Sequence, residues 1–202
     1  MKKLMASAVV LSMVLVGCGS SSKKDTKKPE IALITDSGGI NDKSFNQSAW
    51  EAVKEYGTKN DKGYKYYKPA SFDTAGYKDQ IKNAVDNGAK VVVLPGFKFA
   101  AALGTIQNQE KYKDVKFVAI DFTPTDEKDN AVDVADNVYC ATYKEQQPGY
   151  LAGYAAVKEG YTKIGFMGGM ALPAVINYGY GYSMNHQKLR LKLLDGTMVV
   201  LM

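Results

Sequence analysis

The sequence predicts an α/β fold built on a parallel β-sheet, and three observations support this prediction. From residue 30 onward, short apolar runs alternate with segments whose apolar residues recur every three or four positions, as strands and amphipathic helices do. The run at residues 91–94 is apolar throughout, which is typical of a strand covered on both faces. The composition is that of a globular chain, with 46% hydrophobic and 23% charged residues among 202.

The elements are expected in alternating order. The apolar runs predict strands at residues 31–35, 64–69, 91–94 and 116–120, an extended segment ending at 140–143, and a strand starting at 163–167. The first helix is expected to begin near Ser44, which caps it itself or through a neighbour. The second helix should end at Asn87-Gly88, a common helix stop. Two more helices are expected at about residues 97–109 and 145–158.

The first 29 residues indicate a lipoprotein leader and a tether. Lys2 and Lys3 precede an apolar run of secretory-signal length, too short for a comfortable bilayer span. The run ends in Leu-Val-Gly-Cys18, which is similar to a lipobox, so residues 1–17 are expected to be removed and Cys18 to be acylated. This localises the chain to the extracytoplasmic face of the cell membrane. Residues 18–29, rich in Ser and Lys, form a flexible tether whose lysines either rest on anionic headgroups or are simply solvated.

Candidate ligand-binding residues follow the predicted strands. Ligands of parallel α/β sheets bind at the carboxyl ends of the strands. Those ends carry carboxylates, aromatic rings and glycine turns, in the segments 36–39, 70–73, 96–97 and 121–122. Aromatic faces stack on rings, and carboxylates accept hydrogen bonds from hydroxyl or amino groups. The rim therefore suits a flat, polar ligand.

Several other chemistries are disfavoured. Asp42 stands where a phosphate-binding loop needs Gly before Lys43-Ser44, and no dinucleotide fingerprint or nucleophile elbow is present. One His and two Cys exclude a multi-histidine or four-cysteine metal centre, so neither metal nor cofactor is expected. Lysines interrupted by acids disfavour nucleic acid as a partner. An enzyme remains the alternative, in which Asp36 and Asp121 act as an acid/base pair. The favoured interpretation is that the chain is not an enzyme.

Residues 36–50, Asp-Ser-Gly-Gly-Ile-Asn-Asp-Lys-Ser-Phe-Asn-Gln-Ser-Ala-Trp, resemble the basic membrane protein family of bacterial lipoproteins. The resemblance continues at residues 95–97, 118–121, 145–153 and 164–170, and runs from about residue 30 to 182. The family includes purine nucleoside receptors that feed ABC transporters. The resemblance implies a type I periplasmic-binding-protein-like fold with Rossmann-like lobes, which closes by a hinge around a purine nucleoside and delivers it to a permease.

The resemblance also implies a set of ligand-binding residues. Phe45 looks like the aromatic residue that stacks on the purine, with Asp36 and Asn46 beside it, although Asn46 is equally suited to cap a helix. Asp121 looks like a polar contact. The full set is Asp36, Phe45, Asn46, Gly96, Phe97 and Asp121. Trp50, on the same helix, is expected to be core.

The resemblance predicts the domain organisation. Residues 30–137 are expected to form the first lobe and 138–182 the start of an incomplete second lobe. From residue 183 the sequence departs from the family, and the single His and single Arg both lie there, so a truncated or frameshifted product is expected. The rival reading is a short variant with an amphipathic terminal helix. An incomplete second lobe predicts weak or absent nucleoside binding and exposed apolar surface at residues 164–182.

The net charge of +5 lies at the chain ends. The leader carries +2, the tether +3 and residues 184–202 carry +2, so residues 29–183 carry −2. Two other functions remain open: a surface lipoprotein or adhesin without a transport role, and a nucleoside hydrolase on a similar fold.

Overall fold

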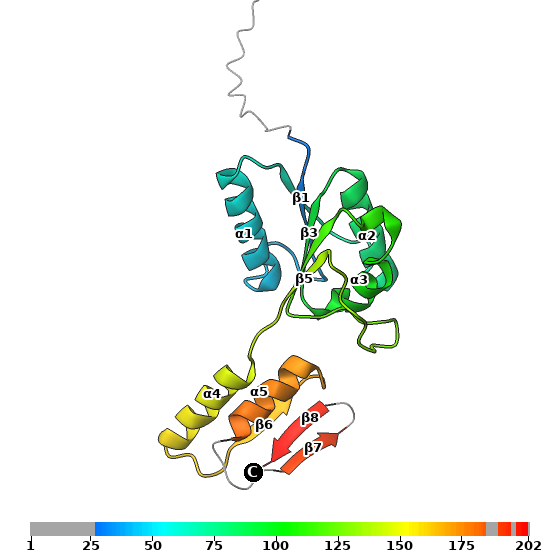
Figure 1. Cartoon of the computed structure of the whole chain (residues 1–202). Coiled ribbons are helices and arrows are strands. Elements are labelled where there is room, and N and C mark those ends of the chain that lie inside the picture. The colour runs from blue at the N-terminus through cyan, green and yellow to red at the C-terminus, as the bar shows by residue number, and fades with distance from the viewer. Residues whose placement is uncertain (1–26, 185–189, 195–196, 202) are drawn as a thin grey trace, which may run out of the picture.

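The core of the molecule is a five-stranded sheet in which the neighbouring strands are all parallel, as predicted (Figure 1). The computed structural model describes residues 27–184 and the backbone of 190–194 and 197–201, so Cys18, the leader and most of the tether lie outside the described residues. The strand order is β2-β1-β3-β4-β5. The strands are β1 (Ile31–Ile34), β2 (Tyr64–Tyr67), β3 (Val91–Pro95), β4 (Lys116–Ile120) and β5 (Val138–Ala141).

Helices cover both faces of this sheet. Helix α1 (Phe45–Lys59) packs on one face, and α2 (Thr74–Asp86) with α3 (Ala100–Ile106) packs on the other (Figure 1). Two 3₁₀ turns, η1 (Phe97–Phe99) and η2 (Glu110–Tyr112), flank α3. Helix α2 ends where predicted, because Gly88 adopts φ 106° directly after it.

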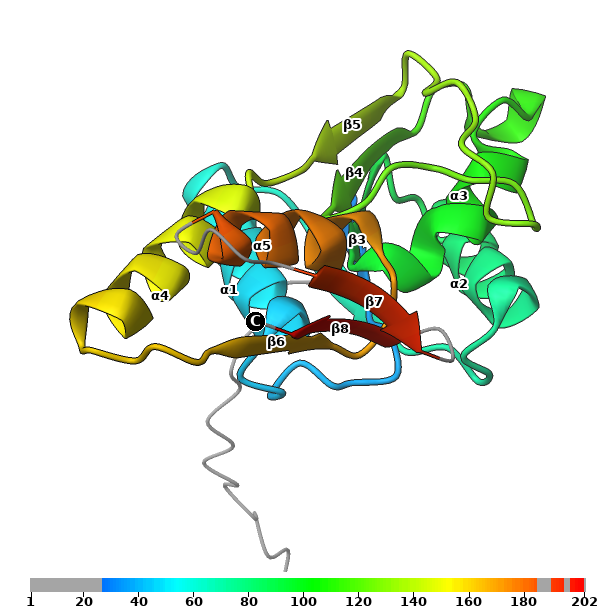
Figure 2. The same ribbon diagram turned by 90° about the horizontal axis from the view of Figure 1, so that it is seen from below.

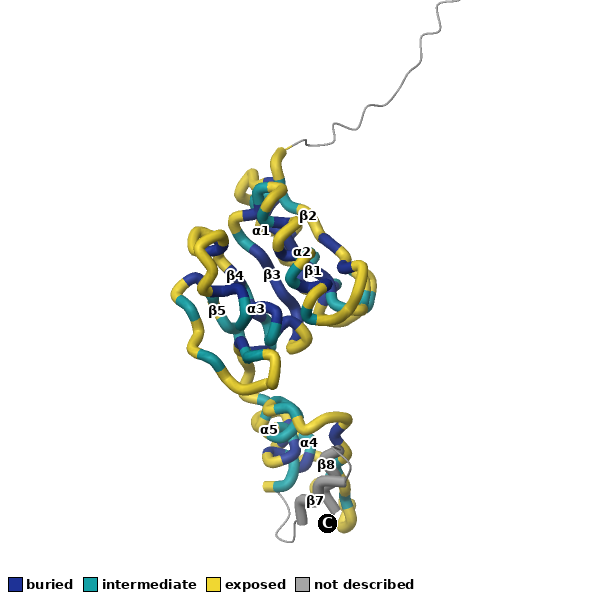
Figure 3. The backbone as a smooth tube through the Cα atoms, turned by 90° about the vertical axis from the view of Figure 1, so that its right-hand side faces the viewer, coloured by how far each residue is buried: buried dark blue, intermediate teal, exposed yellow. Residues whose placement is uncertain are grey.

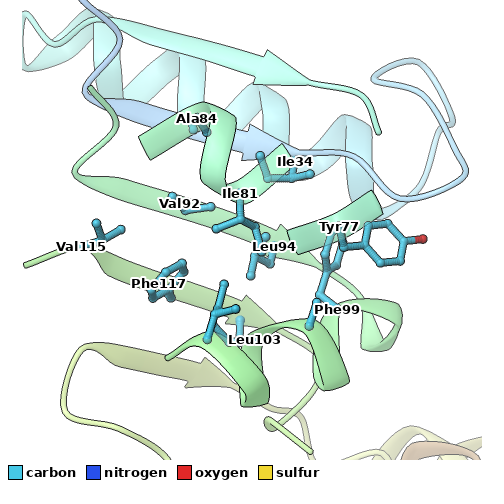
Figure 4. Packing of buried hydrophobic residues seen from close by; sticks show 14 of the residues in the cluster. Ile34, Tyr77, Ile81, Ala84, Val92, Leu94, Phe99, Leu103, Val115 and Phe117 are labelled. Atoms are coloured by element: carbon cyan, nitrogen blue, oxygen red, sulfur yellow. The ribbon is translucent and has the colours of Figure 1, made fainter. Parts of the chain in front are cut away.

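The larger hydrophobic cluster lies beneath α2 and α3, where Tyr77 and Phe99 pack with their ring centroids 4.6 Å apart (Figure 4). The smaller cluster lies beneath α1. Strand β3 serves both, because Val92 and Leu94 point into the larger cluster and Val93 into the smaller. The uninterrupted apolar run thus has the two-sided burial that it predicts.

The chain then forms a second, smaller unit. It consists of α4 (Gln146–Lys158), β6 (Gly165–Gly168), α5 (Pro173–Ser183), β7 (Arg190–Leu194) and β8 (Thr197–Leu201). The strands form an antiparallel sheet of order β6-β8-β7, and α5 contacts both α4 and this sheet (Figure 2). Buried residues are concentrated in the first unit (Figure 3). Met167 and Met170 are 78% and 52% exposed, which confirms the expected apolar surface. None of the described helices is long and apolar enough to cross a bilayer.

Three expectations need correction. The first sheet does not end at residue 137, because β5 pairs in parallel with β4. The helix expected at 97–109 is a 3₁₀ turn followed by a short α3, after which the buried Gln107 side chain bonds the backbone of Asp133 and Ala135. The terminal segment is a strand pair rather than an amphipathic helix. Its apolar residues alternate with Arg190 and Lys192, a period of two that favours a strand.

Candidate functional site

Three loops that carry predicted site residues meet at one edge of the first sheet, which we call the carboxyl edge. Asp36 follows β1, Gly96 and Phe97 follow β3, and Asp121 follows β4. The amide of Gly96 donates to the carbonyl of Ile120 at 2.8 Å, so the loops after β3 and β4 adjoin. The order β2-β1-β3 also places a topological switch point between β1 and β3, where ligands of open α/β sheets bind.

The carboxylate of Asp36 is held in place by its own loop and by α1. Its Oδ1 atom accepts hydrogen bonds from the Gly38 amide and from Asn46 Nδ2, both at 2.7 Å. Asn46 Oδ1 in turn accepts from the Asp36 amide at 3.1 Å. The other carboxylate oxygen, Oδ2, makes none of these bonds and lies 3.6 Å from Lys98 Nζ. A fixed acceptor therefore stands at the switch point.

Asn46 does not face the edge as a ligand contact would. Asn46 is only 2% exposed. Both protons of its side-chain amide are used, since Nδ2 donates to Asp36 Oδ1 and to Asp42 Oδ2, each at 2.7 Å. The structure gives Asn46 the role of positioning Asp36. The simpler reading of Asn46, as part of the helix start, describes its contacts better than direct ligand binding.

Asp42, rather than Ser44, caps α1. The Ser44 side chain makes no capping bond, while Asp42 Oδ1 accepts from the amides of Ser44 at 2.8 Å and Gln47 at 3.0 Å. Burial pushes the pKa of Asp42 upward, but the hydrogen bonds from Asn46, Gln47 and Ser44 outweigh it and lower the pKa below its usual value. A carboxylate thus already fills the helix start, which agrees with the rejection of a phosphate loop.

The two aromatic rings among the predicted site residues are exposed at this edge. Phe45, the first residue of α1, is 43% exposed, and Phe97 is 39% exposed. A Cβ atom placed on Gly96 would lie 3.9 Å from Phe45 Cδ2, so the ring of Phe45 passes close over the Gly96 backbone. Trp50 behaves as the core residue that was predicted, because its ring packs edge-on against Tyr64 and Tyr66 at 5.6 and 5.3 Å.

Asp121 adopts φ 65°, a left-handed conformation that directs the chain out of β4. Burial, and then the nearby negative charge of Glu145, raise the pKa of Asp121 above its usual value. Glu145 directly precedes α4, so it brings a charge of the second unit near the first sheet. A group that donates a hydrogen bond or carries positive charge would relieve this carboxylate.

Sequence reasoning missed Lys98 and Glu145. Lys98 Nζ donates to Ser37 Oγ at 2.6 Å and so joins the loops after β1 and β3. Its only sequence signal is its place directly after Phe97, within the turn that Gly96 opens. Among the described residues, no group of three or more His, Cys, Asp or Glu is placed to hold a metal ion. Cys140 is half-buried against the larger cluster.

Comparison with known proteins supports a single family. The family described as ABC transporter substrate-binding protein PnrA-like matches residues 28–184. The ABC transporter nucleoside-binding protein BmpA of Lactococcus lactis is 34% identical over 197 residues, which cover 90% of this chain and 52% of BmpA. The CD4+ T-cell-stimulating antigen of Listeria monocytogenes is 31% identical over 194 residues, 89% of this chain and 51% of the antigen.

The fold is also similar to that of a solved ABC transporter solute-binding protein. A crystal structure of an ABC transporter solute-binding protein from Aeropyrum pernix superposes with a TM-score of 0.58 at 20% identity, covering 78% of this chain and 42% of that protein. This likeness shows the solute-binding-protein fold. The chain spans about half the length of the curated relatives it matches. The matched region coincides closely with the resemblance at residues 30–182, and the chain therefore belongs to the Bmp family of PnrA-like ABC transporter substrate-binding proteins.

Proposed function

We propose that this chain is a membrane-anchored substrate-binding lipoprotein that presents a purine nucleoside to an ABC transporter permease. The observation that carries the proposal is the pairing of a fixed carboxylate, Asp36, with the exposed ring of Phe45 at the switch point of the sheet. The Lactococcus relative is a nucleoside-binding protein by name, which supports the same ligand class.

The carboxyl edge offers complementary groups for such a ligand. Phe45 supplies a face on which a base stacks, and Asp36 Oδ2 accepts from a hydroxyl or amino group. Lys98 lies beside Asp36 and donates to an acceptor on the ligand. Of these groups, the Asp121 carboxylate is stabilised most by a hydrogen-bond donor on the ligand, because its charge is disfavoured in the free protein. Gly96 and Phe97 form the wall between these groups.

The anchor is part of the same proposal. Acylation of Cys18 would hold the chain on the extracytoplasmic face of the membrane, close to the permease. The acyl group is checked by the mass of the processed amino-terminal peptide. A Cys18→Ala chain that still fractionates with membranes after alkaline washing would contradict lipid anchoring.

Nucleoside binding is tested by calorimetry with guanosine and adenosine. The walls that the structure describes come mainly from one sheet edge, so we expect weak binding. Release of free base from either nucleoside would instead establish a hydrolase, especially if Asp36→Asn abolished it.

A surface antigen without a transport role is the second candidate, and the name of the Listeria relative favours it. The two functions separate in cells that lack the gene. Transport predicts slower uptake of labelled nucleoside after deletion, whereas an antigen role predicts unchanged uptake.

A further inference from the structure

The edge of the first sheet opposite the ligand site, which we call the amino edge, carries a row of lysines. Backbone hydrogen bonds place the row directly across the strand starts: the Lys90 amide donates to the Glu30 carbonyl, and the Lys116 amide donates to the Lys90 carbonyl, each at 2.8 Å. The right-handed α/β connections return each helix to this edge, so Lys59, the last residue of α1, also lies there.

The charge of the first unit is polarised along the strands. The segments at the amino edge, 27–30, 59–63, 82–90, 110–116 and 136–137, contain nine lysines and six acidic residues. The segments at the carboxyl edge, 36–44, 68–78, 96–98, 121–131 and 142–145, contain six lysines and eight acidic residues. One end of the unit therefore carries three excess positive charges and the other two excess negative charges.

The amino edge is also where the chain enters the fold. The first described residue, Lys27, pairs with Asp61 in the turn before β2, and Figure 1 shows this end lying away from α4 and α5. Lys27 lies nine positions after Cys18, with eight residues between them. Even fully extended, the nine steps from Cys18 to Lys27 span about 30 Å. An acyl group on Cys18 would thus keep the amino edge within a few Debye lengths of a bilayer.

We propose that the amino edge is a membrane-facing surface that binds anionic phospholipid headgroups. The proposal rests on the lipid anchoring of Cys18 proposed above. Each lysine near an anionic surface strengthens association by about fivefold. The acidic carboxyl edge is repelled by the same surface. Together these forces orient the first unit with its ligand site toward the medium, where a nucleoside arrives.

The only tryptophan of the chain, Trp50, reports this orientation. The processed, lipidated full chain is reconstituted in phosphatidylcholine vesicles with or without one third phosphatidylglycerol, both containing a dansyl-headgroup lipid. Energy transfer from Trp50 to dansyl measures how closely the first unit approaches the bilayer. We expect at least twofold higher transfer on the anionic vesicles, lost when salt is raised to about 0.5 M.

Two double variants distinguish an effect of the amino edge from an effect of the net charge of the chain. Lys59→Glu/Lys116→Glu removes charge from the amino edge, and Lys128→Glu/Lys144→Glu removes the same charge elsewhere. All four lysines are exposed, and within the described part of the chain none of them forms an ion pair. The first pair of substitutions should return the transfer to the level of neutral vesicles, and the second should leave it high.

Equal transfer on both kinds of vesicle, or equal loss in both double variants, would overturn the proposal. The mass of the amino-terminal peptide reports the anchor separately. If it shows no acyl group, the anchoring is wrong, and flotation of the chain with anionic vesicles tests the surface alone. In that case the amino edge still predicts at least about 25-fold weaker binding for Lys59→Glu/Lys116→Glu, and unchanged binding would refute it.

Discussion

The conformation of the loop around Asp36 depends on the buried side-chain amide of Asn46, which two carboxylates share. Asn46 Nδ2 bonds both Asp36 and Asp42, and the backbone of Gly38 closes over them. A Cβ atom on Gly38 would lie 2.8 Å from Asn46 Nδ2 and 3.0 Å from Asp42 Oδ2. The position of the Asp36 carboxylate therefore depends on the absence of a side chain two residues away.

Gly38→Ala is expected to lower the free energy of unfolding by about 1–3 kcal/mol, because the added methyl group forces this network apart. Chemical denaturation measures the change. Gly39→Ala is the matched control, since its Cβ would meet no atom within 4 Å. Equal losses in the two variants would show that the loop, and not the network, determines the effect.

We expect the charged side chain of Asp121 to lower the free energy of unfolding at neutral pH. Its pKa is raised in the folded chain, first by burial and then by Glu145, so the folded state holds the proton more tightly than the unfolded state does. Stability then falls as the pH rises from the ordinary Asp pKa through this raised value.

Asp121→Asn, which tolerates the left-handed backbone, should melt at a higher temperature than the parent chain at pH 7. The difference should vanish near about pH 3, below the ordinary pKa of Asp, where both side chains are neutral. A melting temperature that the substitution leaves unchanged at pH 7 would mean that Asp121 is not destabilised by its surroundings.

At the scale of elements, the strands that the sequence predicted best are those whose apolar runs are covered on both faces. The apolar runs at residues 31–35, 91–94 and 116–120 became β1, β3 and β4. Strand β5 was predicted only as an extended segment of the second lobe. Its residues Val138–Ala141 are part-exposed, and only their pairing with β4 assigns them to the first sheet.

The site was predicted to the same extent. Parallel topology brings Asp36, Gly96 and Asp121 to one edge whatever their side chains do, so the strand ends alone predict that these three residues lie near one another. The inward turn of Asn46 and the reach of Lys98 depend on side-chain direction, which spacing along the chain does not encode.

Helices α4 and α5 pack through glycines, and this contact defines the second unit. A Cβ atom on Gly153 would lie 2.2 Å from the backbone carbonyl oxygen of Tyr182. Gly153→Ala should therefore separate the helices, at a cost of about 1–3 kcal/mol to this unit. Hydrogen exchange should accelerate in α4 and α5 and stay unchanged in β1, β3 and β4. Gly169→Ala, with no atom within 4 Å of its Cβ, should exchange like the parent chain.

At the scale of the whole molecule, the first unit holds both the larger core and the proposed ligand-binding groups. The second unit leaves wide apolar surface in solvent, with Leu151 and Tyr161 each 63% exposed. Such surface is typical of a face that packs against something else. The ligand groups on the described residues accordingly lie open on one side, and this openness is the reason for expecting weak binding.

The central claim is that the carboxyl edge of the first sheet is a nucleoside-binding surface, and an NMR titration of the full chain with guanosine and adenosine tests it most directly. We predict amide shifts confined to residues 36–47, 96–98 and 121–122, with millimolar or weaker affinity. Phe45→Ala should weaken binding at least about fivefold through loss of stacking, while Tyr56→Ala, at an exposed aromatic residue toward the other end of α1, should not. Shifts elsewhere, or binding that is unchanged by Phe45→Ala, would contradict this account.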